Sequence, residues 1–247
     1  MRRKFLIILM MMLFGVCSVQ AVDITLSTSG TIELGDIYDD VYVENDGTIV
    51  DMLGGQIGRL RLSDGSIFNM DGGNITGGID AHESSYFDMS NGTIDVDSTM
   101  VLYGVGGSFS GGNVTANGLK TGVSSTVQID GGILNFGTFD IYGDIMISGG
   151  SLGVSGIFSS HNNTIDIFSG QLTVYDIGFD EYSTMNIYGR DFIYDSVQKI
   201  LTGYLVDDSY LSMGGVDQWE YEQFNLIPEP TTLLLFGLGG LFLRKRN

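Results

Sequence analysis

The sequence predicts an all-β fold, a right-handed parallel β-helix (β-solenoid) with coils of about 18–20 residues. Three observations predict it: glycine pairs recur at a nearly constant interval, the segments between them alternate apolar and polar residues, and both prolines lie near the C-terminus. A fixed period of this length is typical of proteins built from stacked repeats. Alternation with period two is typical of strands, in which successive side chains point to opposite faces.

The glycine pairs mark the repeat. Each is a Gly-Gly or polar-Gly pair, and its second glycine lies at Gly55, Gly73, Gly92, Gly112, Gly132, Gly150 and Gly170. Successive members of this series lie 18, 19, 20, 20, 18 and 20 positions apart. Glycine suits the corner of a coil because it adopts positive φ without steric cost and lets neighbouring backbones approach closely.

The segments on both sides of each pair have strand character. Residues 66–71, 144–148 and 164–169 alternate apolar and polar side chains, and a second apolar stretch follows each pair, as at 172–175. Strands stack about 4.8 Å apart, so roughly eight coils between Ile32 and Gly189 predict a rod on the order of 40 Å long. The alternative is an antiparallel β-sandwich, with turns about every 8–12 residues. The regular period favours the β-helix.

Residues 1–21 contain the three parts of a secretory signal peptide. Arg2, Arg3 and Lys4 are basic, residues 5–16 are apolar, and small residues precede Ala21. We predict cleavage after Ala21. An uncleaved anchor is disfavoured because a spanning helix requires roughly 20 apolar residues. The single cysteine, Cys17, is removed with this segment, so the mature chain has no disulfide.

Four segments follow from these patterns: a signal peptide at 1–21, a repeat domain at 22–190, a C-terminal cap at 191–226 and a C-terminal signal at 227–247. The repeat is lost in the cap, as expected where a solenoid must close its exposed end. We expect Trp219 to cover the core there.

The mature body is strongly acidic. It holds five basic residues and 29 of the 30 acidic ones, a net charge of −24. Such a field repels nucleic acid and anionic polysaccharide and attracts divalent cations or basic partners. We therefore expect no nucleic-acid partner.

The C-terminal signal has three parts. Pro228, Glu229 and Pro230 precede an apolar run at 233–243. The basic residues that follow it are Arg244, Lys245 and Arg246. An apolar helix followed by basic residues halts in a membrane with its charges in the cytoplasm. Proline keeps the preceding segment extended.

This pattern resembles the PEP-CTERM sorting signal. The resemblance implies recognition by an exosortase-type membrane peptidase, transient anchoring of a C-terminal hydrophobic helix in the inner membrane, and cleavage near the motif. It also implies release or attachment at the surface of an exopolysaccharide-producing bacterium. A plain tail anchor is the alternative. The repeat body is similar to the Gly-Gly repeat regions of exported PEP-CTERM proteins from planctomycete-like bacteria, which implies location and architecture but no chemistry.

Catalytic chemistry is not indicated, and we expect no enzyme. The basic residues of the body are scattered at Arg59, Arg61, Lys120, Arg190 and Lys199. His82 and His161 lie about four coils apart, and no partner for a general base is evident. Four tyrosines form either an aromatic strip for carbohydrate or a structural ladder: Tyr103, Tyr142, Tyr175 and Tyr188.

No cofactor is expected, and calcium is the one candidate. Asp and Asn oxygens are ligands for hard cations, but residues 71–74 and 130–132 match a calcium-binding repeat only in part. Turn formation is the favoured explanation for these residues. The sequence therefore predicts an exported structural or adhesive protein of the cell surface or extracellular matrix, with exopolysaccharide as a candidate partner. The alternative is a carbohydrate-binding or polysaccharide-degrading β-helix.

Overall fold

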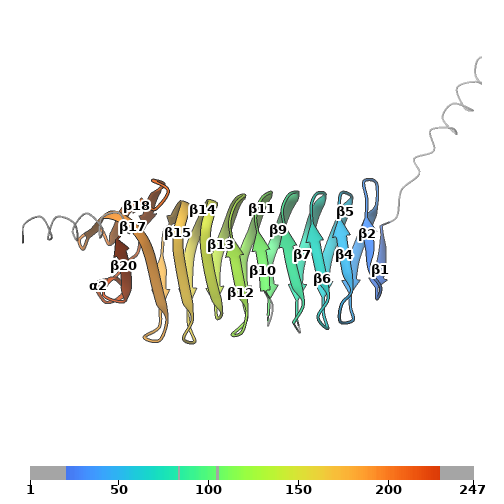
Figure 1. Cartoon of the computed structure of the whole chain (residues 1–247), viewed down its shortest axis with the longest axis horizontal. Helices are drawn as coiled ribbons and strands as arrows, with labels where there is room; N and C mark the ends of the chain where they lie inside the picture. Colours follow the sequence, from blue (N-terminus) through green and yellow to red (C-terminus); the bar gives the residue numbers. More distant parts are fainter. Residues whose placement is uncertain (1–20, 83, 104–105, 229–247) are drawn as a thin grey trace, which may run out of the picture.

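The computed structural model describes residues 21–82, 84–103 and 106–228. Strands β1–β20 and one short helix, α2, form an elongated stack of coils with β1 at one end and β20 near the other (Figure 1). Successive coils pair in parallel, and most residues pair with one 18–20 positions later, as in Gln56↔Asn74 and Asn113↔Ile133. The predicted parallel solenoid is confirmed, and the antiparallel sandwich is wrong.

In the regular part of the stack, a longer and a shorter strand alternate. The longer strands are β1 (Val22–Leu26), β3 (Ile37–Val43), β5 (Gln56–Leu62), β7 (Asn74–Ala81), β9 (Thr93–Leu102), β11 (Asn113–Thr121) and β13 (Ile133–Ile141). The shorter strands are β2 (Gly30–Ile32), β4 (Ile49–Met52), β6 (Ile67–Met70), β8 (Tyr86–Met89), β10 (Gly106–Phe109) and β12 (Thr126–Ile129). Toward the C-terminus, β14 (Asp144–Ser159) and β15 (Thr164–Val174) each join a shorter strand to the longer one that follows. β16 (Ile177–Phe179) is a separate short strand that pairs with the end of β14, and β17 (Thr184–Asp195) pairs with β15 at its start and with β18 (Ile200–Leu205) at its end.

Each regular coil has three faces because the longer strand bends. In β11 the buried positions are Val114, Ala116 and Gly118, followed by Leu119 and Thr121, so the alternation changes phase between residues 118 and 119. We call the part of each coil directly after the glycine pair the first face and the part beyond the bend the second face. The shorter strands make the third face.

The core is a set of stacked inward-pointing side chains, about two from each face of each coil. On the third face, Phe68 stacks on Phe87 with 6.2 Å between ring centroids, and Phe87 contacts Phe109 at 5.9 Å. All three rings are fully buried. The β-branched, leucine, methionine and phenylalanine residues of the alternating segments thus form one continuous hydrophobic core.

The corner between the third and first faces is tightly packed. A Cβ at Gly111 would lie 2.0 Å from the Ser90 carbonyl oxygen of the preceding coil, and Gly112 has a φ of +77°. The backbone N–H of Asn113 donates to the Gly92 carbonyl at 3.0 Å, which continues the ladder through the corner. Close approach and positive φ explain why glycine recurs here.

The end of the stack differs from the regular coils. Its elements are β18 (Ile200–Leu205), β19 (Tyr210–Met213), α2 (Gln218–Tyr221) and β20 (Phe224–Pro228). β17 and β18 pair antiparallel, as do β18 and β19, while β19 adds in parallel to β15 and β20 adds in parallel to β17. In the cap, β19 therefore adds the last strand to the first face, and β20 adds the last strand to the third face.

The expectation that Trp219 covers the core is wrong, since its side chain is 47% exposed. Helix α2 instead turns its neighbour Glu220 inward. The cap is closed by the buried side chains of Leu201, Leu205, Leu211, Met213 and Val216. Trp219 lies in a four-residue helix, and the directions of side chains on a helix cannot be inferred from the period-two pattern of strands.

Glu220 gives the cap a pH dependence. Its side chain is only 3% exposed, and its Oε2 accepts the backbone N–H of Asp217 at 2.7 Å. Burial raises the pKa of Glu220, and the nearby carboxylates of Asp217 and Asp176 raise it further. Hydrogen bonds from the backbone N–H groups of Asp217 and Phe179 lower it, but by less. A carboxyl group with a raised folded-state pKa destabilises the fold above that pKa, and the cost vanishes below the unfolded-state pKa.

We therefore expect Glu220→Gln to raise the free energy of unfolding at pH 7, because glutamine keeps an oxygen acceptor and removes the charge. The gain should shrink as the pH falls through the folded-state pKa. Urea titrations at several pH values measure it, with the exposed Glu222→Gln as the control. A gain that is unchanged or larger at acid pH would contradict this assignment.

Candidate functional site

The C-terminal motif begins inside the fold. Strand β20 pairs with β17 from Met185↔Phe224 to Gly189↔Pro228, so Pro228 is the last residue of the last strand. Phe224 is buried and contacts Phe179 edge to face, with 5.8 Å between centroids. The other predicted sorting residues lie outside the described residues: Glu229, Pro230, Arg244, Lys245 and Arg246.

The N-terminal boundary is equally close to the fold. Strand β1 begins at Val22, the residue after the predicted cut at Ala21, and pairs in parallel with β3. Residues 1–20 and the predicted hydrophobic helix at 233–243 lie outside the described residues. Within the part of the chain that is described, no helix is long and apolar enough to cross a membrane.

The edge between the second and third faces carries an aromatic and basic cluster. The Lys120 ammonium lies 5.7 Å from the Tyr103 ring centroid and 5.5 Å from that of Tyr142. These residues line a pocket of about 480 Å³. Gly122 also lines it and, having no side chain, leaves space between the two tyrosines. A hydrogen bond with Tyr103 is the main cause that raises the pKa of Lys120.

Both histidines extend this cluster along the stack. His82 contacts Tyr103 with 5.6 Å between centroids, and His161 contacts Tyr142 at 5.1 Å. Register of the coils therefore brings together residues that the sequence places far apart. The four tyrosines do not form one strip: Tyr188 stacks on Phe168 at 4.2 Å, and Tyr175 lies on the first face.

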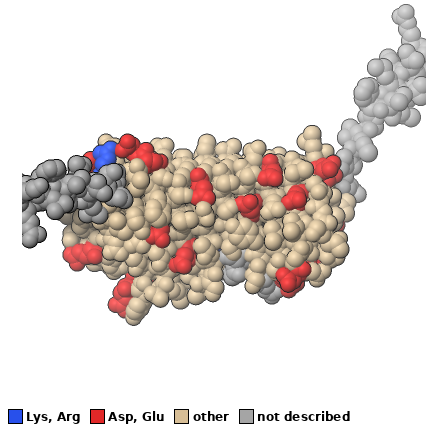
Figure 2. Space-filling view, viewed as in Figure 1, with Lys and Arg blue, Asp and Glu red and all other residues tan. Residues whose placement is uncertain are grey.

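Three of the other basic residues are paired with acids. Arg61 lies 3.8 Å from Asp40 and over the Tyr42 ring, and Lys199 pairs with Asp217 at 2.5 Å. Arg190 pairs with Asp191 at 2.8 Å and Asp208 at 2.5 Å. On the side shown in Figure 2, acidic side chains spread along the whole stack while the basic ones gather near β18. The acidic surface predicted from composition is therefore distributed along the rod.

Polar side chains of the third face bond to one another between coils. The Asn69 amide donates to Asp51 at 2.8 Å, and the Asn186 amide donates to Asp166 at 2.8 Å. Ser108 donates to Asp88 in the same way. Among the described residues, no three His, Cys, Asp or Glu side chains converge to hold a metal ion. Calcium binding stays a prediction.

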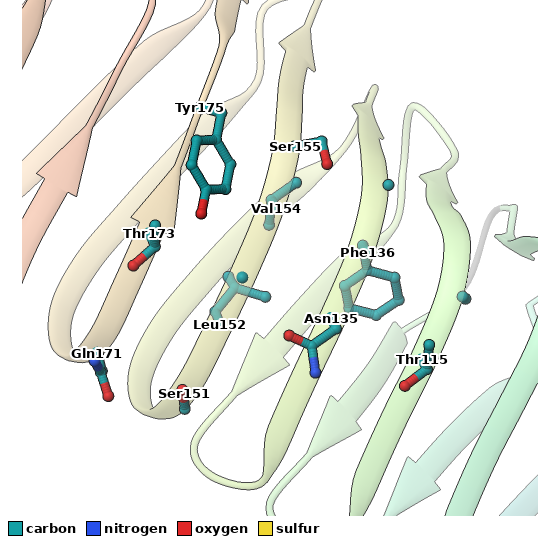
Figure 3. A pocket seen from close by; sticks show the side chains of 13 residues that line it. Thr115, Asn135, Phe136, Ser151, Leu152, Val154, Ser155, Gln171, Thr173 and Tyr175 are labelled. Atoms are coloured by element: carbon teal, nitrogen blue, oxygen red, sulfur yellow. The ribbon is translucent and has the colours of Figure 1, made fainter.

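A shallow groove of about 460 Å³ crosses four coils on the first face (Figure 3). Its outward positions are in register, Thr115↔Asn135↔Gly153↔Thr173, on strands β11, β13, β14 and β15. The absent side chain at Gly153 gives the groove its depth. Its floor is the strand backbone at Ala116, Phe136, Leu152 and Val154, whose side chains are buried in the core.

Tyr175 stands at one end of the groove. It lies in the bend directly after β15, it is 71% exposed, and Figure 3 shows its ring beside the groove. The polar side chains along the rest of the groove are Thr115, Asn135, Ser151, Ser155, Gln171 and Thr173. We call these six the groove polar set. Among the residues that the structure describes, no charged one lines the groove, so this part of the acidic body is an uncharged patch.

The comparisons with known proteins identify the C-terminal signal. The model of the PEP-CTERM protein-sorting motif matches residues 226–246. Curated proteins and solved structures give no match to the chain. The match begins within β20 and covers all six predicted sorting residues. The chain is therefore an exported protein that carries a PEP-CTERM sorting motif and is sorted by its C-terminus.

Proposed function

We propose that this protein is a structural or adhesive component of the cell surface or extracellular matrix, a rigid acidic rod delivered by two processing signals. The observation that carries the proposal is the sorting motif, which begins within the last strand of the solenoid. Cleavage after Pro228 would leave every described strand in place. Cleavage after Ala21 would do the same at the other end, since β1 starts at Val22.

The shape and charge of the solenoid support this role. Parallel coils hydrogen-bonded throughout make a rod that needs no disulfide, which suits an exported chain whose only cysteine is Cys17. The net charge of −24 on the mature body keeps the rods soluble and repels nucleic acid. An exosortase-type peptidase is the partner that processes the tail, and an exopolysaccharide is the partner we propose at the surface.

The sorting step is tested by replacing Glu229 and Pro230 with alanine together. The double variant should accumulate in the inner membrane with its tail intact, because the peptidase loses the motif while β20 is unchanged. Fractionation of the native host and immunoblotting of each fraction measure the distribution. The matched control replaces the adjacent Thr231 and Thr232 with alanine, and it should reach the surface or medium like the wild type. Normal sorting of the E229A/P230A variant would overturn the proposal.

A further inference from the structure

We propose that the first-face groove binds a short stretch of a neutral polysaccharide, with Tyr175 as the platform for one sugar ring. This inference gives the adhesive part of the proposed function a ligand class. It does not depend on how the tail is processed.

The hydrogen-bonding state of the groove is the first observation behind this proposal. Among the described residues, no side-chain hydrogen bond involves any member of the groove polar set, whereas the third face satisfies its amides and hydroxyls between coils, as in Asn69–Asp51. Asn135 and Gln171 thus offer amide donors and acceptors, and the serines and threonines offer hydroxyls. Sugar hydroxyls are both donors and acceptors, so they match this set.

Charge is the second observation. The body is rich in Asp and Glu, yet none of the residues that line the groove is charged. The four first-face segments involved, residues 113–117, 133–137, 151–155 and 171–175, also lack any charged residue. An anionic polymer would be repelled by the surrounding field and would find no cation in the groove. A neutral glycan meets no such repulsion.

Shape is the third observation. Four strands about 4.8 Å apart span ~14 Å, which accommodates about three sugar rings. The gap above Gly153 admits a ring close to the backbone of the sheet. An exposed aromatic ring at the end of a rigid strand stacks against the apolar face of a sugar while nearby polar groups fix its orientation. Tyr175 lies in that position.

The groove lining favours binding over cleavage. Glycoside hydrolysis uses a pair of carboxylic acids on either side of the bond, and the groove lining contains neither Asp nor Glu. We therefore assign the groove to retention of a glycan and not to its degradation.

Two variants test the site without touching the core. Tyr175→Ala removes the platform. Gly153→Phe places a ring in the groove, and the space at Gly153 permits it because only the Asn135 side chain would lie within 4 Å of a new Cβ. The matched control is Thr76→Phe, which adds the same ring at the equivalent outward position of β7, outside the groove.

Binding is measured by isothermal titration calorimetry on the full-length chain in a detergent without a sugar headgroup. The probes are neutral hexamers of glucose, mannose and xylose, with a galacturonate hexamer as the anionic comparison. We expect at least one neutral hexamer to bind the wild type and T76F equally. Y175A and G153F should bind it at least tenfold more weakly, with unchanged circular dichroism spectra.

Three results would overturn the inference: no binding of any neutral hexamer at millimolar concentrations, equal or tighter binding of galacturonate, or wild-type affinity in both groove variants. The first two would reject the ligand class and the third the location. None of them would alter the outcome of the E229A/P230A fractionation, so failure of this inference is distinguishable from failure of the sorting proposal.

Discussion

Replacing Phe87 with alanine is expected to lower the free energy of unfolding by about 3–5 kcal/mol. Phe87 is fully buried in β8, and its ring lies between those of Phe68 and Phe109 in the coils on either side. Truncation leaves a cavity in the middle of a continuous stack. Because each coil of a solenoid contacts only its neighbours, the defect also weakens the coupling between the two halves of the rod.

Urea denaturation followed by circular dichroism measures this effect. A lower midpoint is expected, and a second transition should appear if the halves uncouple. The control is Val123→Ala, an equally apolar truncation at a side chain that is 65% exposed, for which a change within about 0.5 kcal/mol is expected. A loss below about 1 kcal/mol for F87A would show that the stacked rings do not hold the coils together.

Gly111→Ala is expected to destabilise the chain by about 1–3 kcal/mol, because the backbone must move to admit a single methyl group. The new Cβ would lie 2.0 Å from the Ser90 carbonyl oxygen. That atom belongs to the backbone of the preceding coil, so no side-chain rotation relieves the clash. The two coils must separate locally, which also lengthens the hydrogen bonds beside the corner.

The contrasting variant is Gly30→Ala in β2, where nothing lies within 4 Å of a new Cβ. Alanine there restricts the unfolded chain without a clash, so stability should be unchanged or higher by about 0.4–1 kcal/mol. Thermal or urea unfolding of both variants compares them directly. Equal effects of G111A and G30A would mean that close approach of the coils is not the reason for glycine at the corner.

The coil repeat was predictable because two strong local signals coincide. Corners need glycine, and buried strands need alternating apolar residues, so both leave a mark at fixed spacing. The bend that creates separate first and second faces was not predicted, because it appears only as a one-residue change of phase, between residues 118 and 119 in β11. Trp219 was misplaced for a related reason, since α2 interrupts the period-two pattern in the cap.

Sites on the surface depend on register, which differs by one or two residues from coil to coil. Lys120 contacts both Tyr103 and Tyr142, which lie at unequal distances from it along the chain. They come together because the register places the three residues in adjacent coils. The groove left a readable signal that the sequence interpretation did not use. The pentapeptides after the glycine pairs at Gly112, Gly132, Gly150 and Gly170 are free of charge in an otherwise acidic chain.

The central claim is that the exported molecule is the solenoid released from signals at both of its ends. Intact-mass spectrometry of the protein recovered from the envelope or medium of its host tests this most directly. We expect a chain that begins at Val22 and has lost the segment following the Pro228-Glu229-Pro230 motif. A chain that still ends at Asn247 and fractionates with the inner membrane would contradict it.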